Sequence, residues 1–209
     1  MAVYKNKVVL FGGYFDNGKD VRYYNDLWEL DLADFKWAPL GNMTAGLWPS
    51  PRSGCQVSVH TDTMFVFGGY SKARDLDDPD LEHGKAMDDV WALDLIKHKW
   101  ERVKRAGMAP GPRSSFSLVS FRGRAFLFGG ASDNETQGGA DMSSDFHNDL
   151  FTFSCEKRRW FAAELRPPPR AKADAEVSSA VPDEGASQAA SASSPGSLEG
   201  GGEGGLKGT

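Results

Sequence analysis

The amino-acid sequence predicts an all-β protein, in which four-stranded antiparallel sheets repeat along the chain as the blades of an incomplete β-propeller. In three places an aliphatic residue and Phe precede a pair of Gly, an Asp follows, and a Trp stands eleven residues after that Asp. Apolar residues alternate or cluster in short runs, which is typical of strands, and no helical spacing extends over about ten residues before the C-terminal tail. Self-similarity at a period of about 60 residues, near the roughly 50 of some blade-forming repeats, indicates a propeller or a similar array.

Each unit is predicted to contain four short strands in a fixed order. The first follows Pro-Arg, the second ends in the double Gly, the third follows the Asp and the fourth carries the Trp. The repeated structural residues are Gly12, Gly13, Asp26 and Trp37, then Gly68, Gly69, Asp89 and Trp100, and then Gly129, Gly130, Asp149 and Trp160. We expect the Gly pairs to allow close approach of a neighbouring chain, the Asp residues to set the turn before the third strand, and the Trp residues to pack between sheets.

The three blades are expected at about residues 1–45, 46–108 and 109–166, followed by a disordered tail at 167–209. The tail is rich in Pro, Gly, Ala and Ser and has no aromatic residue, so it cannot bury enough apolar surface to offset the entropy of ordering it. The Pro-Arg of the first unit should stand sixteen residues before Gly12, which falls before Met1, so we expect this unit to lack its first strand.

Three blades are too few to close a ring, because propellers close with about four to eight. The sequence therefore predicts an open arc with an exposed apolar flank at each end. A fragment or splice form of a longer propeller, and a chain that completes its ring by self-association through the open blade edges, both fit this pattern.

The segments that join each Gly pair to its Asp vary in length, and we expect them to form loops at one end of the propeller. They comprise residues 14–24, 70–87 and 131–147. Variable loops on a repeated scaffold are the usual place for a partner to bind.

Composition limits the classes of partner and compartment. The 209 residues have a net charge of −5, so no basic face for nucleic acid is expected. The N-terminus lacks the apolar run of a secretory signal, and no stretch approaches the roughly eighteen apolar residues of a membrane span. We expect a cytoplasmic protein, with the nucleus as the alternative. Cys55 and Cys155 are far apart and outside any Cys-x-x-Cys spacing, so neither a disulfide framework nor a zinc site is predicted.

No catalytic residue, metal or cofactor is predicted. The four His residues fall at unrelated positions in the three units, so the repeat does not bring them together. His83 follows an acidic stretch at 75–82, but a calcium loop needs a central Gly that this stretch lacks. Neither a Gly-x-Ser-x-Gly nucleophile elbow nor a phosphate-binding Gly loop is found.

The blocks Pro-Arg-Ser, aliphatic-Phe-Gly-Gly, Asn-Asp-Leu and the spaced Trp resemble the kelch repeat, whose units each form one four-stranded blade of a β-propeller. The resemblance covers about residues 3–166. The stretches most similar to the kelch domain-containing protein 4 group are residues 24–28, 51–56, 67–72 and 146–150. Some kelch relatives are enzymes with copper or iron, but the Tyr, His and Cys or Glu, Asp and His sets that hold those metals are not found.

In kelch proteins that act as substrate receptors, the residue after the double Gly and the residues that open the Pro-Arg strand bind the peptide. The resemblance therefore implies partner-binding residues at Tyr14, Arg52, Ser53, Tyr70, Arg113 and Ser114, with Ala131 as a weaker third position after the Gly pairs. Arg offers a fork of donors to carboxylates, and Ser and Tyr add hydroxyl groups. The alternative interpretation is that Arg52 and Arg113 tie neighbouring blades together.

The leading functional hypothesis is a non-catalytic scaffold that presents propeller loops to a partner protein. It predicts that Arg52→Ala combined with Arg113→Ala weakens partner capture, whereas loss of folding would assign both residues to structure. The alternatives are a propeller enzyme or metal-binding protein, and a truncated product without independent function.

Overall fold

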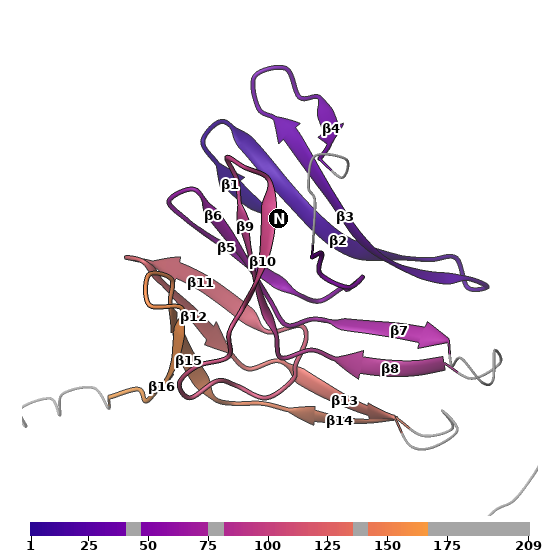
Figure 1. The fold of residues 1–209 in the computed structure, drawn as a ribbon. Helices are drawn as coiled ribbons and strands as arrows, with labels where there is room; N and C mark the ends of the chain where they lie inside the picture. Colours follow the sequence, from indigo (N-terminus) through magenta and orange to yellow (C-terminus); the bar gives the residue numbers. More distant parts are fainter. Residues whose placement is uncertain (41–46, 75–81, 136–141, 167–209) are drawn as a thin grey trace, which may run out of the picture. The chain divides into compact units, whose positions relative to one another are not determined.

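The computed structural model describes residues 1–40, 47–74, 82–135 and 142–166 (Figure 1). All of them belong to the first of two compact units, Met1–Arg166. The predicted disordered tail, 167–209, and the acidic segment at 75–81 lie outside the described residues. Every regular element in the described part of the chain is a β-strand, and that part contains no helix with the length and hydropathy needed to cross a bilayer.

Three four-stranded antiparallel sheets follow one another along the chain, and we name them blades 1 to 3. Blade 1 contains β1 (Ala2–Tyr4), β2 (Lys7–Asp16), β3 (Val21–Asp31) and β4 (Trp37–Pro39). Blade 2 contains β5 (Gln56–His60), β6 (Thr63–Phe67), β9 (Val90–Asp94) and β10 (Lys99–Val103). Blade 3 contains β11 (Ser117–Phe121), β12 (Arg124–Phe128), β15 (Leu150–Ser154) and β16 (Arg159–Ala163). The predicted fold class, an open arc of four-stranded blades, is confirmed.

The expectation that the first unit lacks its first strand is wrong. Residues Ala2–Tyr4 form β1, which pairs antiparallel with β2 through Val3 opposite Val8 and Tyr4 opposite Lys7. A tight turn with Lys5 at a φ of 54° joins the two strands. The turn and the β2 ladder are enough to form this strand, so it does not need the Pro-Arg segment that precedes the other two first strands.

The segments expected to be loops are largely paired strands. β2 and β3 continue as a hairpin past an irregularity between Phe11 and Gly13. In the other two units the same place holds separate two-stranded sheets, β7 (Tyr70–Arg74) with β8 (Glu82–Ala86), and β13 (Ala131–Glu135) with β14 (Met142–Phe146). Backbone hydrogen bonds form these ladders, whose polar sequences lack the apolar alternation that would predict strands.

Two apolar cores lie between successive blades, one between blades 1 and 2 and the other between blades 2 and 3. Trp100 of blade 2 packs edge-on against Phe11 of blade 1, with ring centroids 5.1 Å apart. Trp160 of blade 3 packs in the same way against Phe67 of blade 2, at 5.5 Å. All four rings are buried. Each Trp therefore packs against the Phe that precedes the double Gly of the previous blade.

Trp37 differs from the other two repeat tryptophans, because 49% of its surface is exposed. It occupies the same place in blade 1 that Trp100 and Trp160 occupy in theirs. No blade precedes blade 1 among the described residues, so Trp37 has no Phe to pack against. Its exposure marks an open apolar face at this end of the arc.

The double Gly is required where the chain segments that enter and leave blade 2 pass close to the end of β6. Gly68 has a φ of 54°, and a Cβ placed on it would lie 2.7 Å from the carbonyl oxygen of Arg113. Gly69 has a φ of 111°, and its Cβ would lie 2.9 Å from the carbonyl oxygen of Ser53. Both contacts are closer than carbon and oxygen atoms tolerate. A side chain here would push neighbouring blades apart.

We predict that Gly68→Ala lowers the free energy of unfolding by about 3 kcal/mol, about 1 for the left-handed backbone and about 2 for the clash with Arg113. The matched control is Gly18→Ala, which also has a positive φ, 80°, but has nothing within 4 Å of the added Cβ. Only the backbone cost of about 1 kcal/mol is expected there. Urea unfolding measures both variants, and equal losses would contradict the steric role of Gly68.

Candidate protein-interaction site

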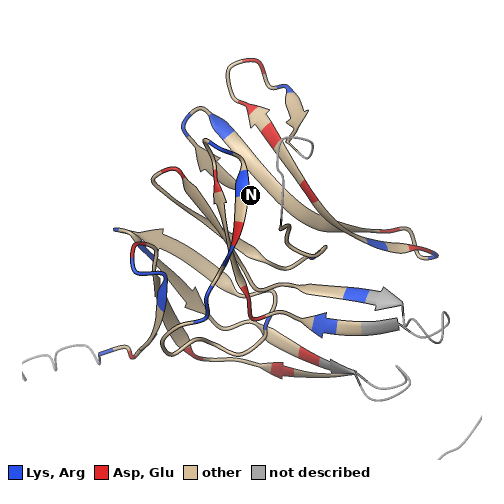
Figure 2. Cartoon of the chain, viewed as in Figure 1, with Lys and Arg blue, Asp and Glu red and all other residues tan. Residues whose placement is uncertain are grey.

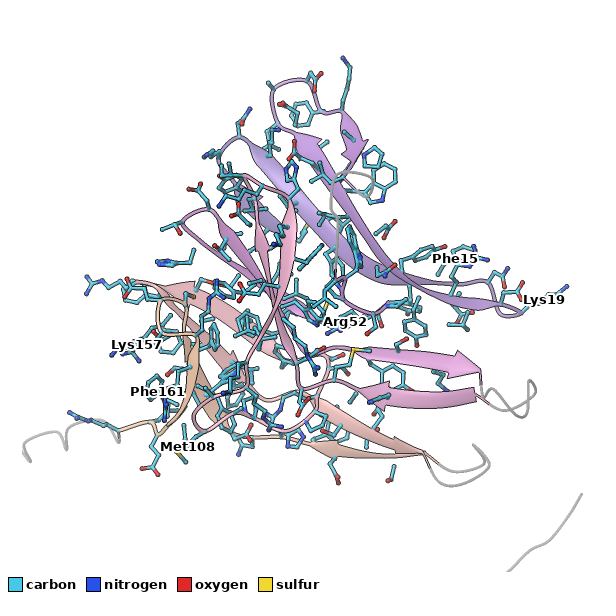
Figure 3. The ribbon with its side chains drawn as sticks, viewed as in Figure 1. Phe15, Lys19, Arg52, Met108, Lys157 and Phe161 are labelled. Carbon is cyan, nitrogen blue, oxygen red and sulfur yellow. The ribbon has the colours of Figure 1, made fainter. Side chains whose placement is uncertain are left out.

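The guanidinium group of Arg52 is buried in the joint between blades 1 and 2, with none of its surface exposed (Figure 3). Its Nη1 donates to the carbonyl oxygen of Gly68 at 3.0 Å and to Asp89 at 2.6 Å, and its Nη2 donates to the second oxygen of Asp89 at 3.2 Å. Its main chain binds blade 1, since its N–H donates to Tyr24 at 3.0 Å and its carbonyl accepts from Gly13 at 2.9 Å. One residue therefore holds blade 2 with its side chain and blade 1 with its backbone.

Arg113 repeats this arrangement in the joint between blades 2 and 3. Its Nη1 donates to the carbonyl oxygen of Gly129 at 3.0 Å and to Asp149 at 2.5 Å, and its Nη2 donates to Asp149 at 3.1 Å. Its N–H donates to the carbonyl of Met87 at 3.1 Å, and its own carbonyl accepts from Gly69 at 3.0 Å. We call each of these two arrangements an arginine clamp.

The three hairpins project from the same end of the blades, because each one joins the second and third strands of its unit (Figure 1). We define the hairpin face as residues 13–24 of β2–β3, together with β7–β8 and β13–β14. The linking segments pair with the bases of the hairpins: Ser53 exchanges two backbone hydrogen bonds of 2.8 Å with Tyr70. Ser114 does the same with Ala131, at 2.9 and 3.0 Å. The arginine clamps therefore lie directly below the hairpin face.

Tyrosine rings connect the first two hairpins. Tyr14 stacks on Tyr23 across the β2–β3 hairpin, with centroids 6.0 Å apart, and Tyr23 meets the edge of Tyr70 at 6.2 Å. Tyr70 is buried at the base of β7, whereas 60% of Tyr14 is exposed. The row of rings therefore runs from the joint outward and leaves Tyr14 open to a partner.

The predicted partner-binding residues are brought together, but at different depths. Arg52, Arg113, Ser114 and Tyr70 are buried, Ser53 is half-buried and Tyr14 is exposed. The geometry of the two arginines favours the interpretation in which they tie blades together. Tyr14 is the predicted residue with the most surface available for a partner.

Three exposed apolar side chains of the hairpin face were missed by the sequence reasoning. They are Phe15, Val21 and Phe146, the last of which is 85% exposed. Phe15 lies on the projecting part of the β2–β3 hairpin (Figure 3). The signal that could have revealed them is an aromatic or aliphatic residue inside an otherwise polar joining segment.

Charge differs between the neighbouring hairpins (Figure 2). The β7–β8 hairpin carries Lys72 and Lys85, whereas the β13–β14 hairpin carries Asp133 and Asp145. The hairpin face therefore changes from positive to negative between blades 2 and 3.

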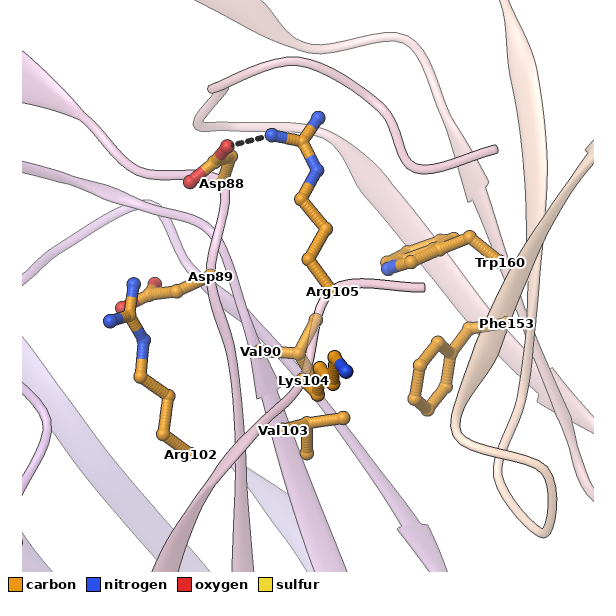
Figure 4. A pocket seen from close by; sticks show the side chains of 9 residues that line it. All are labelled: Asp88, Asp89, Val90, Arg102, Val103, Lys104, Arg105, Phe153 and Trp160. Carbon is orange, nitrogen blue, oxygen red and sulfur yellow. Dashed lines mark hydrogen bonds and ion pairs between the residues drawn. The ribbon is translucent and has the colours of Figure 1, made fainter. Parts of the chain in front are cut away.

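A cleft of about 360 Å³ opens beside the base of β8, between blades 2 and 3 (Figure 4). Val90, Val103, Phe153 and Trp160 supply its apolar lining. Its charged lining consists of Asp88, Asp89, Arg102, Lys104 and Arg105, of which Asp88 and Arg105 form an ion pair. The cleft thus combines an apolar floor with positive charge next to the hairpin face.

Among the described side chains of the hairpin face, Ser132 and His147 form a pair that invites a catalytic interpretation. The Oγ of Ser132 lies 2.8 Å from Nε2 of His147. The same hydroxyl donates its proton to the carbonyl of Pro112. Because Ser has a single O–H, the hydrogen bond with His147 must be donated by the imidazole. This His is therefore not placed to remove a proton from Ser132, and the pair fixes β13 to the linking segment instead.

No group of three or more His, Cys, Asp and Glu residues suited to a metal ion occurs within the described residues. In the acidic stretch at 75–82, residues 75–81 lie outside them. Cys55 and Cys155 are both free thiols, and burial raises the pKa of each.

The repeat geometry agrees with a family comparison. The model of the KLHDC2/KLHL20/DRC7 Kelch-repeats domain matches residues 1–183. The chain belongs to the kelch-repeat family. The prediction of kelch repeats is thereby confirmed.

Curated proteins with similar kelch segments are much longer than this chain. Human host cell factor 2 is 31% identical over 144 residues, which is 62% of this chain and 16% of that protein. The Drosophila melanogaster host cell factor is 33% identical over 122 residues, 55% of this chain and 8% of that protein. The flagellar outer-arm dynein alpha chain of Chlamydomonas reinhardtii is 31% identical over 133 residues, 62% of this chain and 3% of that protein.

Among solved structures, that of YjhT matches with a TM-score of 0.50 and 16% identity, over 75% of this chain and 51% of YjhT. At this identity the match shows the fold alone. This kelch chain thus spans about half of the YjhT structure and less than a fifth of the curated relatives described above.

The arginine clamps lower the pKa of their carboxylates. Burial of Asp89 acts to raise its pKa, but the hydrogen bonds and positive charge of Arg52, together with the indole N–H of Trp91, outweigh it and bring the pKa below the ordinary value. The pKa of Asp149 is lowered chiefly by its hydrogen bonds from Arg113, against a smaller effect of burial. Both carboxylates are therefore more acidic in the folded arc than in an unfolded chain.

We predict that Arg52→Met lowers the free energy of unfolding by about 3 kcal/mol or more, because it leaves Asp89 and the carbonyl of Gly68 without their partner in the joint. Urea unfolding measures the loss. Lys36→Met is the control, since Lys36 and Asp34 form an exposed ion pair, for which little effect is expected. Adding Asp89→Leu to Arg52→Met should recover part of the loss by removing the unpaired carboxylate. If Arg52→Met has the same free energy of unfolding as the wild type, the clamp does not hold the blades together.

Acid should weaken the clamps in a defined pH window. Carboxylates with a lowered folded pKa stabilise the fold fully above the unfolded pKa of about 3.9, and this stabilisation is lost as the pH falls below that value through the folded pKa. The free energy of unfolding of the wild type should therefore fall as the pH drops below about 4, and Asp89→Asn should show a shallower fall. Asp34→Asn, at the exposed pair, serves as the control. Parallel curves for the wild type and Asp89→Asn would be inconsistent with a charged clamp.

Proposed function

We propose that this kelch chain is a non-catalytic interaction scaffold, which binds a partner protein through the hairpin face. The observation that carries the proposal is the exposure of Tyr14, Phe15 and Phe146 on hairpins that project beyond the blades. The two buried cores between the blades do not include these three residues. Aromatic side chains at the centre of an interface commonly supply much of its binding energy.

The charge of the hairpins limits the kind of partner that fits. Lys85 on β7–β8 suits an acidic side chain, and Asp133 on β13–β14 suits a basic one. Complementary potentials of this kind fix the orientation of a bound segment and suppress wrong partners. We infer a partner segment with an apolar anchor for the tyrosine row, followed by acidic and then basic residues.

Within the family we assign the chain to the kelch domain-containing protein 4 group. This assignment is supported by the similar stretches at residues 24–28, 51–56, 67–72 and 146–150. Three of them lie in the linking segments and hairpin ends that surround the proposed interface.

A displayed library of random peptides, selected on the immobilised chain, supplies a probe for the hairpin face. Peptides selected on the wild type should bind Tyr14→Ser/Phe146→Ser at least about 30-fold more weakly, since two exposed aromatic anchors are lost. Circular dichroism checks that the variant remains folded.

Ile96→Ser is the matched control, because Ile96 is also exposed but lies on the turn at the opposite end of β9. It should bind the selected peptides like the wild type. Equal binding by all three proteins would place recognition elsewhere and overturn the proposal.

A further inference from the structure

The two ends of the arc carry the separate halves of a joint that the chain builds twice within itself. In both internal joints a Trp packs against the Phe that precedes a double Gly, Trp100 on Phe11 and Trp160 on Phe67. The corresponding Phe of blade 3 is Phe128, and the corresponding Trp of blade 1 is Trp37. These two side chains are 48% and 49% exposed, whereas their four counterparts are buried.

Each unpaired ring lies on a wider apolar face. Residues directly opposite one another on neighbouring strands have their side chains on the same face of the sheet. One such row crosses the four strands of blade 1 on its outer face and consists of Val3, Val8, Leu30 and Trp37. On blade 3, the register places on the outer face the exposed side chains of Val119, Phe121, Phe128 and Phe161. Apolar faces of this kind on a soluble protein indicate an interaction site.

A second contact between blades, beside the Trp–Phe contact, indicates that the open faces fit a second copy of this chain. In the internal joint between blades 2 and 3, Arg158 donates to Glu101 at 2.7 Å. By their spacing from the repeat Trp, the matching positions at the open ends are Phe35 in blade 1 and Phe161 in blade 3. Phe35 is exposed, and Phe161 is at the edge of exposure. Where the internal joint has an ion pair, the two ends of the same chain carry two Phe side chains that suit each other.

We propose that two copies of this chain pair head to tail, with blade 3 of each packed against blade 1 of the other. Trp37 of one copy then packs on Phe128 of its partner, and Phe35 meets Phe161. Two arcs of three blades make six, within the range of about four to eight that closes a propeller. A head-to-tail contact that closes on itself yields a discrete ring, and it covers both open faces at once.

The clamp position of blade 1 is incomplete, as expected of a joint that lacks its other half. Asp26 corresponds to Asp89 and Asp149, yet it is exposed and its carboxylate accepts from the indole of Trp28 at 2.8 Å, with no Arg in the clamp position of the described residues.

Light scattering on a size-exclusion column tests the pairing with the full 209-residue chain. We expect a mass twice the 22.7 kDa of one chain. Trp37→Ser and Phe128→Ser should each raise the dissociation constant about 100-fold or more, since each substitution alters both joints of the dimer. Ile96→Ser and Tyr14→Ser should leave it unchanged, because neither residue lies on an open face.

Mixing the two single variants distinguishes head-to-tail pairing from other dimers. In a mixed pair, Trp37 of the Phe128→Ser chain meets Phe128 of the Trp37→Ser chain, so one joint is intact and association should be partly restored. A monomeric wild type would overturn the proposal and would leave the open faces to other blades. So would a dimer that persists in both variants, open-ended oligomers in place of a dimer, or a mixture that associates no better than its components.

Discussion

The structure depends on an arginine that is buried between blades. A guanidinium group without water is costly to bury, and it is tolerated here because a carboxylate and a carbonyl oxygen take up its hydrogen bonds. The side chain of Arg52 is bound to one blade and its backbone to the previous one, so the position of each blade fixes that of the next. Arg113 repeats the same contacts, and this repetition turns separate four-stranded sheets into an arc.

The clamps also give the hairpin face a defined base. The linking residues Ser53 and Ser114 follow the clamp arginines directly and pair with the first residues of β7 and β13. The hairpins are therefore anchored where they leave the blades. Their exposed aromatic residues lie near these bases, at Tyr14 and Phe146, and further out, at Phe15. Structure and the proposed recognition thus depend on different residues: buried charges join the blades, and the exposed rings lie on the first and third hairpins.

The sequence predicted the blades well, because each motif corresponds to a local physical demand. Gly68 is needed for a positive φ against a crossing chain, and Trp100 for filling the space between sheets. Other features could not be read from one chain. The strand β1 was missed because its turn carries no motif, and the hairpins were missed because their ladders are polar. The burial of Arg52 depends on Asp89, which stands 37 residues further along the chain, so only the folded structure brings the pair together.

Hydrogen exchange at single backbone amides tests most directly whether the arginines join the blades. The amide of Gly13 donates to the carbonyl of Arg52 across the first joint, and that of Gly69 donates to Arg113 across the second. In Arg52→Met, the Gly13 amide should exchange much faster, while the Gly69 amide and the amides inside the ladders of blade 2 keep most of their protection. A Gly13 amide that stays as protected as in the wild type would contradict the role of the clamp.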